Sequence, residues 1–155
     1  MTNSTLKRLS KWDQRYIDLA KQVSTWSKDP SRKIGAVAVG SKGQILAQGY
    51  NGFPRGILDS TERYDNREVK YKYVVHAEMN VIYNASFSGV SLDGSSLFVY
   101  GLPVCNECAK GIIQVGISRV LIFTDEIVPS IWSDSFELTC EMFKEANVKC
   151  TWIKP

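Results

Sequence analysis

Histidine is almost missing from this sequence, since His76 is the one such residue among 155. Long apolar runs are missing as well, because no stretch approaches the ~18 residues that span a bilayer. The first residues, MTNSTLKRLSKWDQ, lack the apolar stretch of a secretory signal peptide. We therefore expect a cytoplasmic protein that is not a membrane protein. In that reducing setting its four cysteines would serve metal binding, catalysis or packing in preference to disulfides.

The sequence also lacks a strong excess of charge of either sign. Its formal net charge is +3 and its pI is near 8.6. Nucleic-acid binding would normally show a stronger basic patch, so we expect no nucleic-acid partner. An anionic small molecule is compatible with this mild charge. With 44% hydrophobic residues, a chain of this length is expected to form one domain that spans residues 1–155.

Apolar periodicity predicts a first helix, a hairpin and a loop in the N-terminal half. One helical face is apolar, and the Asp29-Pro30 pair should end that helix; the face comprises Trp12, Tyr16, Leu19, Ala20, Val23 and Trp26. Residues 33–40 and 43–50 are short apolar runs separated by turn residues, which predicts a hairpin. Residues 57–73 are polar and non-periodic, so we expect a long loop.

The second half alternates between helical and strand patterns. Helices are expected from His76, over residues 105–116, and along a last face that holds Phe136, Cys140 and Phe143. Strands are expected between them, over residues 95–102, 119–125 and 148–153. This alternation predicts an α/β fold with a mixed sheet and helices packed on its faces.

Two short motifs carry the chemistry of the chain. His76 stands in the stretch VVHAEMN, and Cys105 and Cys108 form a C-x-x-C at the expected start of a helix. Zinc binds histidine nitrogen and cysteine sulfur, usually with four ligands in a tetrahedron. These residues supply three ligands and leave one position open, which is typical of a catalytic zinc site.

Glu78 lies two residues after His76 and can turn toward the open position. Zinc lowers the pKa of a bound water to about 7, which makes hydroxide available at neutral pH. Attack on an aromatic carbon that bears an amine needs a group to take the proton from water and return it to the ring nitrogen and the leaving amine. The chain has no second histidine for that task, so we predict that Glu78 is the catalytic proton shuttle.

Each motif alone has a simpler explanation. A lone C-x-x-C can be a redox pair, and a single histidine is more often an ordinary core or surface residue. A structural zinc site could recruit Cys140 or Cys150 as a fourth ligand. The two motifs together are far more specific than either one.

The combined signature resembles that of the zinc-dependent nucleobase deaminases, which the H-x-E and P-C-x-x-C motifs define. The match extends over roughly residues 11–126 and is strongest to the deoxycytidylate (dCMP) deaminases of phages and cells. It is carried by the segments WDQRYIDLAKQVSTWSKDPSRKIGAVAV, GYNGFPRG, HAEMNVIYNA and CNECAKGIIQVGI.

This resemblance implies a three-layer α/β/α sandwich around a five-stranded mixed sheet. It implies zinc-dependent hydrolysis of dCMP to dUMP and ammonia, which supplies dUMP for thymidylate synthesis. Members of the family are often hexamers that dCTP activates and dTTP inhibits, with Mg²⁺ on the triphosphate. The resemblance also implies that His76, Cys105 and Cys108 are the zinc ligands and that Glu78 is the proton shuttle.

Further site residues follow from the same resemblance. Asn51 matches an asparagine that binds the sugar or lines the pocket, although Asn-Gly also favours left-handed turns. The GYNG motif of the effector site occurs here as Gly49-Tyr50-Asn51-Gly52, with Arg55 close behind. Peptide groups near Ala77 and Cys105 would hold the pyrimidine.

The chain departs from the family pattern at two places. Val104 stands where relatives have a proline, with Pro103 one position earlier, and valine can adopt the same backbone shape before a helix. Relatives carry a tyrosine after the fourth strand that stacks on the pyrimidine. The best match here is Trp132, whose indole could stack on the base or simply pack the last helix.

The 5′-phosphate of the substrate needs cations or N–H donors. The candidates near the pocket motifs are Lys28, Arg32, Lys33 and Arg55, each of which could instead be an exposed loop charge. The 57–73 segment could cover the active site or contact another subunit, but most of its charges are expected to be solvated. Other readings of the whole chain are a deaminase of dCTP, cytidine or adenosine in tRNA, and a non-catalytic zinc-containing nucleotide sensor.

Overall fold

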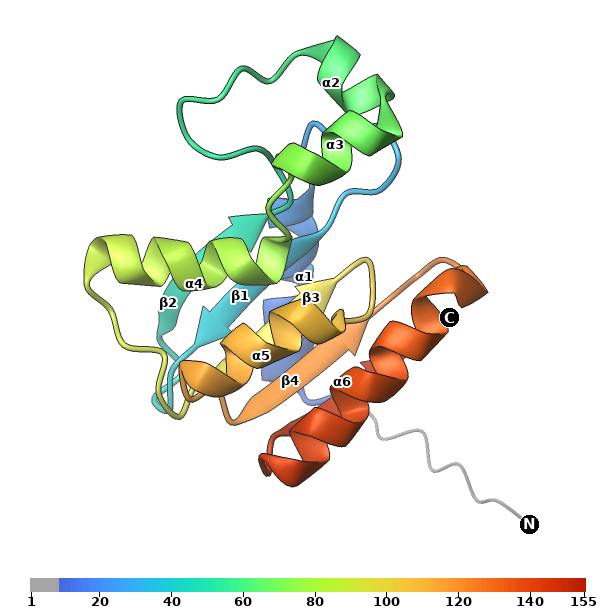
Figure 1. Ribbon diagram of the computed structural model, residues 1–155. Helices are drawn as coiled ribbons and strands as arrows, with labels where there is room; N and C mark the ends of the chain where they lie inside the picture. The colour runs from blue at the N-terminus through green and yellow to red at the C-terminus, as the bar shows by residue number, and fades with distance from the viewer. Residues whose placement is uncertain (1–8) are drawn as a thin grey trace.

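The computed structural model describes residues 9–155, which form a five-stranded sheet with helices on both faces (Figure 1). The strands are β1 (Gly35–Val39), β2 (Ile45–Tyr50), β3 (Ser96–Tyr100), β4 (Arg119–Phe123) and β5 (Lys149–Ile153). Their order in the sheet is β2-β1-β3-β4-β5. The hairpin β1–β2 and the pair β1–β3 are antiparallel, whereas β3, β4 and β5 run parallel.

Three helices cover one face of the sheet and one helix covers the other. The helices α4 (Ala77–Ser88), α5 (Asn106–Gln114) and α6 (Ser133–Glu145) lie on the near face in Figure 1, and α1 (Lys11–Ser24) lies behind the sheet. The strands alternate accordingly, because Leu97 and Val99 pack toward the three helices while Phe98 packs toward α1. The expected three-layer α/β/α sandwich with a five-stranded mixed sheet is therefore confirmed.

The first helix ends earlier than its apolar pattern suggested. It stops at Ser24, where the Ser24 and Thr25 hydroxyls each donate to the carbonyl oxygen three residues before, at 2.6 Å. Trp26 thus lies beyond the helix and is 51% exposed. The side of α1 that packs on the sheet includes Ile17, which the predicted face omitted, whereas Trp12 remains exposed.

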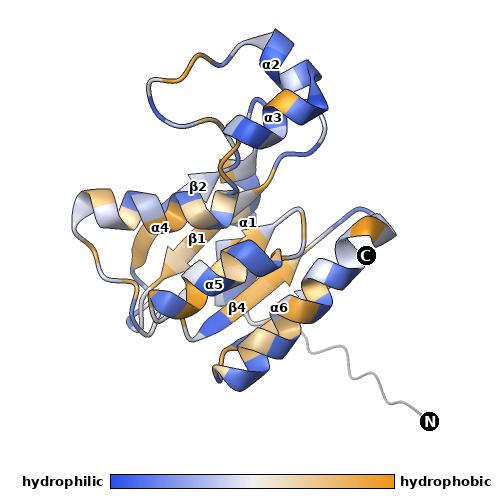
Figure 2. Cartoon of the chain, viewed as in Figure 1, coloured by the Kyte–Doolittle hydropathy of each residue, from blue (hydrophilic) through white to orange (hydrophobic). Residues whose placement is uncertain are grey.

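The prediction of a long loop over residues 57–73 is wrong for most of this segment. It contains two short helices, α2 (Thr61–Asp65) and α3 (Arg67–Tyr73), which project beyond the edge of the sheet in Figure 1. Ser60 and Asn66 cap them by accepting hydrogen bonds from the backbone N–H groups three residues later. Helices of five and seven residues are too short to show an apolar period, and Figure 2 shows them mostly hydrophilic.

Stacking holds this helical segment to the body of the protein. The ring of Phe53 lies parallel to the ring of Tyr64 on α2, with their centroids 4.1 Å apart. At its far end, Val75 pairs with Gly52 through two backbone hydrogen bonds of 2.8 and 3.1 Å. The last helix also differs in one detail from its predicted face, since Phe143 is buried but Cys140 is exposed. No described helix is long and apolar enough to cross a membrane.

Candidate active site and metal centre

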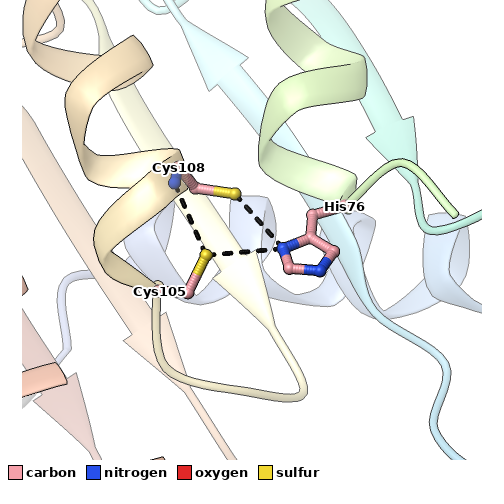
Figure 3. A group of neighbouring side chains, drawn as sticks. All are labelled: His76, Cys105 and Cys108. Atoms are coloured by element: carbon pink, nitrogen blue, oxygen red, sulfur yellow. Dashed lines mark hydrogen bonds between the residues drawn. The ribbon is translucent and has the colours of Figure 1, made fainter. Parts of the chain in front are cut away.

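The two sequence motifs meet where the helices α4 and α5 begin. His76 is the N-cap residue of α4 and Cys105 is the N-cap residue of α5, both with extended backbone angles. Figure 3 shows the imidazole of His76 turned toward the sulfur atoms of Cys105 and Cys108. The strand order places these helix starts side by side, because α4 and α5 cross the same face of the sheet in one direction.

The donor atoms converge at distances that suit a tetrahedral zinc ion. His76 Nδ1 lies 3.4 Å from the Sγ atoms of both Cys105 and Cys108, and all three donor atoms lie within 4.8 Å of one another. In a tetrahedron with ordinary zinc–nitrogen and zinc–sulfur bonds, neighbouring donors are roughly 3.5 Å apart. The residues present therefore fit the metal. Cys140 on α6 and Cys150 on β5 do not join this group, which weakens the structural-zinc alternative.

The electrostatics of the cluster favour a bound cation. A hydrogen bond from Cys108 lowers the pKa of the Cys105 thiol, and contact with His76 lowers it further. The thiolate form is the one that binds metals. The same contact with Cys105 raises the pKa of His76, with the carboxyl of Glu78 adding to the effect. The Cys105 thiolate therefore offers a cation one negatively charged donor beside the ring of His76.

Glu78 lies beside the cluster, as the second residue of α4. Its side chain is 4% exposed, and burial raises the pKa of its carboxyl. The carboxyl lines the same cavity as His76 and Cys105. A buried carboxyl whose pKa is raised toward neutrality can both accept and release a proton, as a proton shuttle must.

A cavity of about 250 Å³ opens above the cluster. It is large enough for part of a nucleotide and mixes apolar walls with a few charged groups, as small-molecule sites do. Its lining includes four of the predicted substrate-binding residues, namely Arg32, Asn51, Ala77 and Trp132. Trp132 belongs to the short 3₁₀ helix η1 (Ser130–Trp132), which precedes α6.

Three of the four candidate phosphate ligands, Lys28, Lys33 and Arg55, do not line this cavity. The ammonium group of Lys28 pairs with Asp59 at 3.1 Å and does not line the cavity. The guanidinium of Arg55 stacks over Phe87 and donates a hydrogen bond to the amide oxygen of Asn84. Among the candidates that were named for the phosphate, Arg32 is the one in the cavity wall.

Asn51 is buried and its side chain is tied to the 29–34 segment. Its Oδ1 accepts a hydrogen bond from the Ile34 N–H at 2.9 Å, and its Nδ2 donates to the Arg32 carbonyl at 2.9 Å. Its backbone is not left-handed, so the turn explanation of this asparagine is wrong. In this arrangement Asn51 fixes the wall of the cavity.

The other residues of the GYNG motif bring β2 close to α4. A Cβ atom on Gly49 would lie 2.6 Å from both the Ala77 carbonyl oxygen and the Val81 nitrogen, so only glycine fits. Gly52 forms the backbone pair with Val75 that immediately precedes His76. The Tyr50 carbonyl accepts a 2.7 Å hydrogen bond from the side chain of Asn80. The motif therefore holds the start of α4 against the sheet, and with it His76, the first of the three candidate zinc ligands.

The valine that replaces the family proline is compatible with the helix start. Val104 is fully buried, and its carbonyl accepts a hydrogen bond from the Thr139 hydroxyl at 2.9 Å. Cys105, which follows it, keeps the extended conformation of an N-cap. The preceding Pro103 is buried and lines the cavity.

Sequence reasoning missed the contribution of α3 to the cavity. Arg67, Lys70 and Tyr71 of this helix line it, together with Asp29 and Ser31 from the segment before β1. Lys70 is buried and forms an ion pair with Asp29 at 3.2 Å. The capping residues Ser60 and Asn66, each followed by an acidic residue in the first turn, were the available signal for helices here.

Fold and site together define a class of protein. A histidine and two cysteines at adjacent helix starts, with a buried glutamate beside an open cavity, form the site of a zinc-dependent hydrolase in an α/β/α sandwich. Residues 10–124 match the model of the "cytidine and deoxycytidylate deaminase zinc-binding region". The chain belongs to this zinc-binding deaminase family.

Individual relatives agree with this assignment. An uncharacterised deaminase of Aliivibrio fischeri is 39% identical over 147 residues, which cover 94% of this chain and 95% of that protein. The deoxycytidylate deaminase of Mus musculus is 38% identical over 144 residues, covering 88% of this chain and 76% of the mouse protein. The crystal structure of a dCMP deaminase from the cyanophage S-TIM5, in complex with dCMP and dUMP, is 26% identical. It superposes with a TM-score of 0.70 over 90% of this chain and 95% of the phage chain.

Proposed function

We propose that the protein hydrolyses dCMP to dUMP and ammonia and so supplies dUMP for thymidylate synthesis. The observation that carries this proposal is the buried carboxyl of Glu78 in the same cavity as the His76 and Cys105 side chains. Relatives that share most of the chain are deoxycytidylate deaminases, and the similar cyanophage enzyme was crystallised with dCMP and dUMP. The cytoplasm, where nucleotide precursors are made, is the proposed location.

His76, Cys105 and Cys108 would hold one zinc ion per subunit. When bound there, the ion would supply an activated water at the position that the protein leaves open. Glu78 accepts the proton released by the attacking water and passes it to ring nitrogen N3. It then takes the second proton, from the hydroxyl now on C4, and transfers it to the amine as the C4–N bond breaks and the C4 carbonyl forms, so that dCMP and water give dUMP and ammonia. Burial of Glu78 keeps bulk water from competing for these protons.

The walls of the cavity would orient the nucleotide. Peptide groups of Ala77 and Cys105 lie at the cluster, where they can hold the edge of the pyrimidine. Trp132 also lines the cavity and offers an indole face on which the base can stack. Asn51 and Arg32 line the same cavity, where Asn51 is a candidate neighbour of the sugar and Arg32 a candidate ligand of the phosphate. Lys28 would have to leave Asp59 to take part.

Regulation is a separate part of the proposal. The Gly49–Gly52 motif and Arg55 would form the site for dCTP as activator and dTTP as inhibitor, each carrying Mg²⁺ on its triphosphate. Tyr50 is 39% exposed on the edge strand β2, and Arg55 lies at the surface, so both are accessible to a ligand. A hexamer is the proposed assembly, as in the family that the sequence resembles.

The direct test is the ultraviolet change from cytosine to uracil with zinc-loaded protein and dCMP. The assay is run with Mg·dCTP, with Mg·dTTP and with neither, and dCTP and cytidine serve as competing substrates. Turnover of dCMP that rises with dCTP and falls with dTTP would support both the reaction and the regulation. Turnover that ignores both effectors would retain the enzyme and remove the regulatory site. Preferred turnover of dCTP or cytidine would change the substrate, and retained zinc with no turnover would favour a nucleotide sensor.

A further inference from the structure

The helix α3 brings positive charge to the cavity from a segment that sequence reasoning treated as a solvated loop. Arg67 and Lys70 both line the cavity, as do Ser31 and Arg32 of the segment before β1. Asp29 supplies a single negative charge on this side. Lys70 is paired with Asp29 and Arg32 lies 3.8 Å from a carboxylate oxygen of Glu126, so among residues 9–155 Arg67 is the cation of this lining without a carboxylate partner.

Lys70 anchors α3, because its buried ammonium group is paired with Asp29 in the segment before β1. Its side chain is 6% exposed and that of its partner Asp29 is 7% exposed, at a distance of 3.2 Å. Lys70 Nζ also lies 3.4 Å from the Ser31 hydroxyl. A buried ion pair is costly to break, because no water is present to replace the lost partner. The ammonium carries three N–H donors, and these contacts engage two of them.

Arg67 differs from every other cation at the cavity. Within residues 9–155 no carboxylate lies within ion-pair distance of its guanidinium, and the guanidinium makes no side-chain hydrogen bond there. Its one described interaction is a contact with the ring of Tyr71, at 5.9 Å from the centroid. Arg32, by contrast, donates to the carbonyl oxygens of Gly101 and Ile127, both at 3.2 Å.

We propose that Arg67, supported by Lys70 and the Ser31 hydroxyl, binds the 5′-phosphate and makes the enzyme select a nucleotide over a nucleoside. Guanidinium matches a phosphate with two parallel N–H donors, and Arg67 has those donors free. Lys70 holds α3 in place through its ion pair with Asp29, and Arg67 is an exposed residue of this helix that lines the cavity. The proposal rests on the proposed function, because it requires a phosphate-bearing cytosine substrate.

The experiment compares wild type, Arg67→Ala and Lys72→Ala with dCMP and with deoxycytidine. Lys72 is the matched control, since it lies on α3, is exposed, and is absent from the lining of the cavity. Loss of a charge-assisted contact predicts a fall of roughly 10- to 100-fold in kcat/KM for dCMP in Arg67→Ala. This fall should come from a higher KM for dCMP, while kcat stays within about twofold of the wild-type value. The kcat/KM for deoxycytidine should not change. Lys72→Ala should behave as wild type.

The outcomes separate this proposal from the proposed function. A wild-type protein without dCMP turnover would remove the function itself. An active wild type with an unchanged KM for dCMP in Arg67→Ala would overturn the phosphate role alone, as would an equal loss for dCMP and deoxycytidine. If deoxycytidine turnover is too slow to measure, the inhibition constants of dUMP and deoxyuridine are compared. Weaker inhibition by dUMP alone in Arg67→Ala would support the proposal, and equal weakening of both would overturn it.

Discussion

At the scale of single residues, Glu78 is the acidic group that lies in the cavity beside the three candidate zinc ligands. Glu78 is the second residue of α4, and its carboxyl is buried. It follows His76 by two residues, and the ring of His76 points at the two cysteine sulfur atoms. Burial raises the pKa of the carboxyl, because it disfavours the charged form of the group and so costs stability. A structural zinc module would have no use for such a carboxyl at the open position.

Replacing Glu78 by glutamine should therefore remove catalysis and leave the metal. The amide has the same shape but cannot carry the proton, so we expect deamination of dCMP to fall about 10²- to 10⁴-fold. Zinc content, measured by atomic absorption, should equal that of wild type. Glu107→Gln is the matched control, because Glu107 is exposed on α5 next to Cys108 and pairs with Lys110. An active Glu78→Gln protein would refute the role of this residue.

At the scale of elements, the site depends on how closely β2 approaches α4. Gly49 has no room for a Cβ, whereas a Cβ on Gly52, in the same motif, would meet its nearest neighbour at an ordinary 3.6 Å. Substitutions at these two glycines can therefore distinguish the packing role of Gly49 from other roles of the motif. The strand–helix contact is what keeps His76 beside the cysteines of α5.

Gly49→Ala should accordingly destabilise the protein, by about 1–3 kcal/mol, because backbone atoms of α4 have to move. Gly52→Ala should cost less than about 1 kcal/mol. Urea unfolding of both variants measures the difference. Equal stability of the two variants would show that β2 and α4 can separate without cost.

The helix α1 is tied to the sheet by a two-point ion pair. Arg119 on β4 donates to both carboxylate oxygens of Asp13, at 2.7 and 3.1 Å, and these hydrogen bonds lower the pKa of Asp13. A carboxyl whose pKa is lowered in the folded state contributes stability above its unfolded pKa, near 3.8, and loses it as the pH falls through the folded value.

Asp13→Asn should thus reduce the free energy of unfolding at pH 7 by about 0.5–1 kcal/mol, a modest value because Arg119 is partly exposed. The gap between the variant and wild type should narrow once the pH falls below about 4. Thermal melts between pH 7 and pH 2 provide the measurement. A gap that persists at the lowest pH would show that the contribution is not ionic.

At the scale of the whole molecule, zinc would join the starts of two helices that also pack against each other in the core. His76 comes from the start of α4 and the cysteines from α5, which are 29 residues or more apart in the chain. A ligand that binds only the folded protein stabilises it in proportion to its affinity. The metal is therefore expected to contribute to stability as well as to catalysis.

Removal of zinc by a chelator should lower the melting temperature and abolish deamination. Adding back zinc should restore both, whereas magnesium should restore neither, because thiolates prefer the softer ion. Differential scanning calorimetry with and without chelator gives the first readout, and Glu78→Gln serves as the control that should lose stability in the same way. An unchanged melting temperature would mean that the cluster binds no metal in solution.

The sequence predicts some parts of the fold better than others. The strands and the helices of the sandwich were predictable, because their apolar residues form short runs or recur with the period of a helix. The helices α2 and α3 were not, since their stability comes from caps, from Tyr64 stacked on Phe53 and from Lys70 paired with Asp29. Those partners are distant in sequence and leave no local period.

The sequence by itself determined the donor set and the chemistry. A single histidine, one C-x-x-C and a glutamate two residues after the histidine leave few combinations that can bind zinc and move a proton. Tertiary structure alone decided which charges reach the cavity. It placed Arg67 and Lys70 there, turned Lys28 toward Asp59, and set Arg55 over Phe87. The reason is physical: metal donors follow from residue type and spacing, whereas the direction of a long cationic side chain depends on partners that only the folded chain brings near.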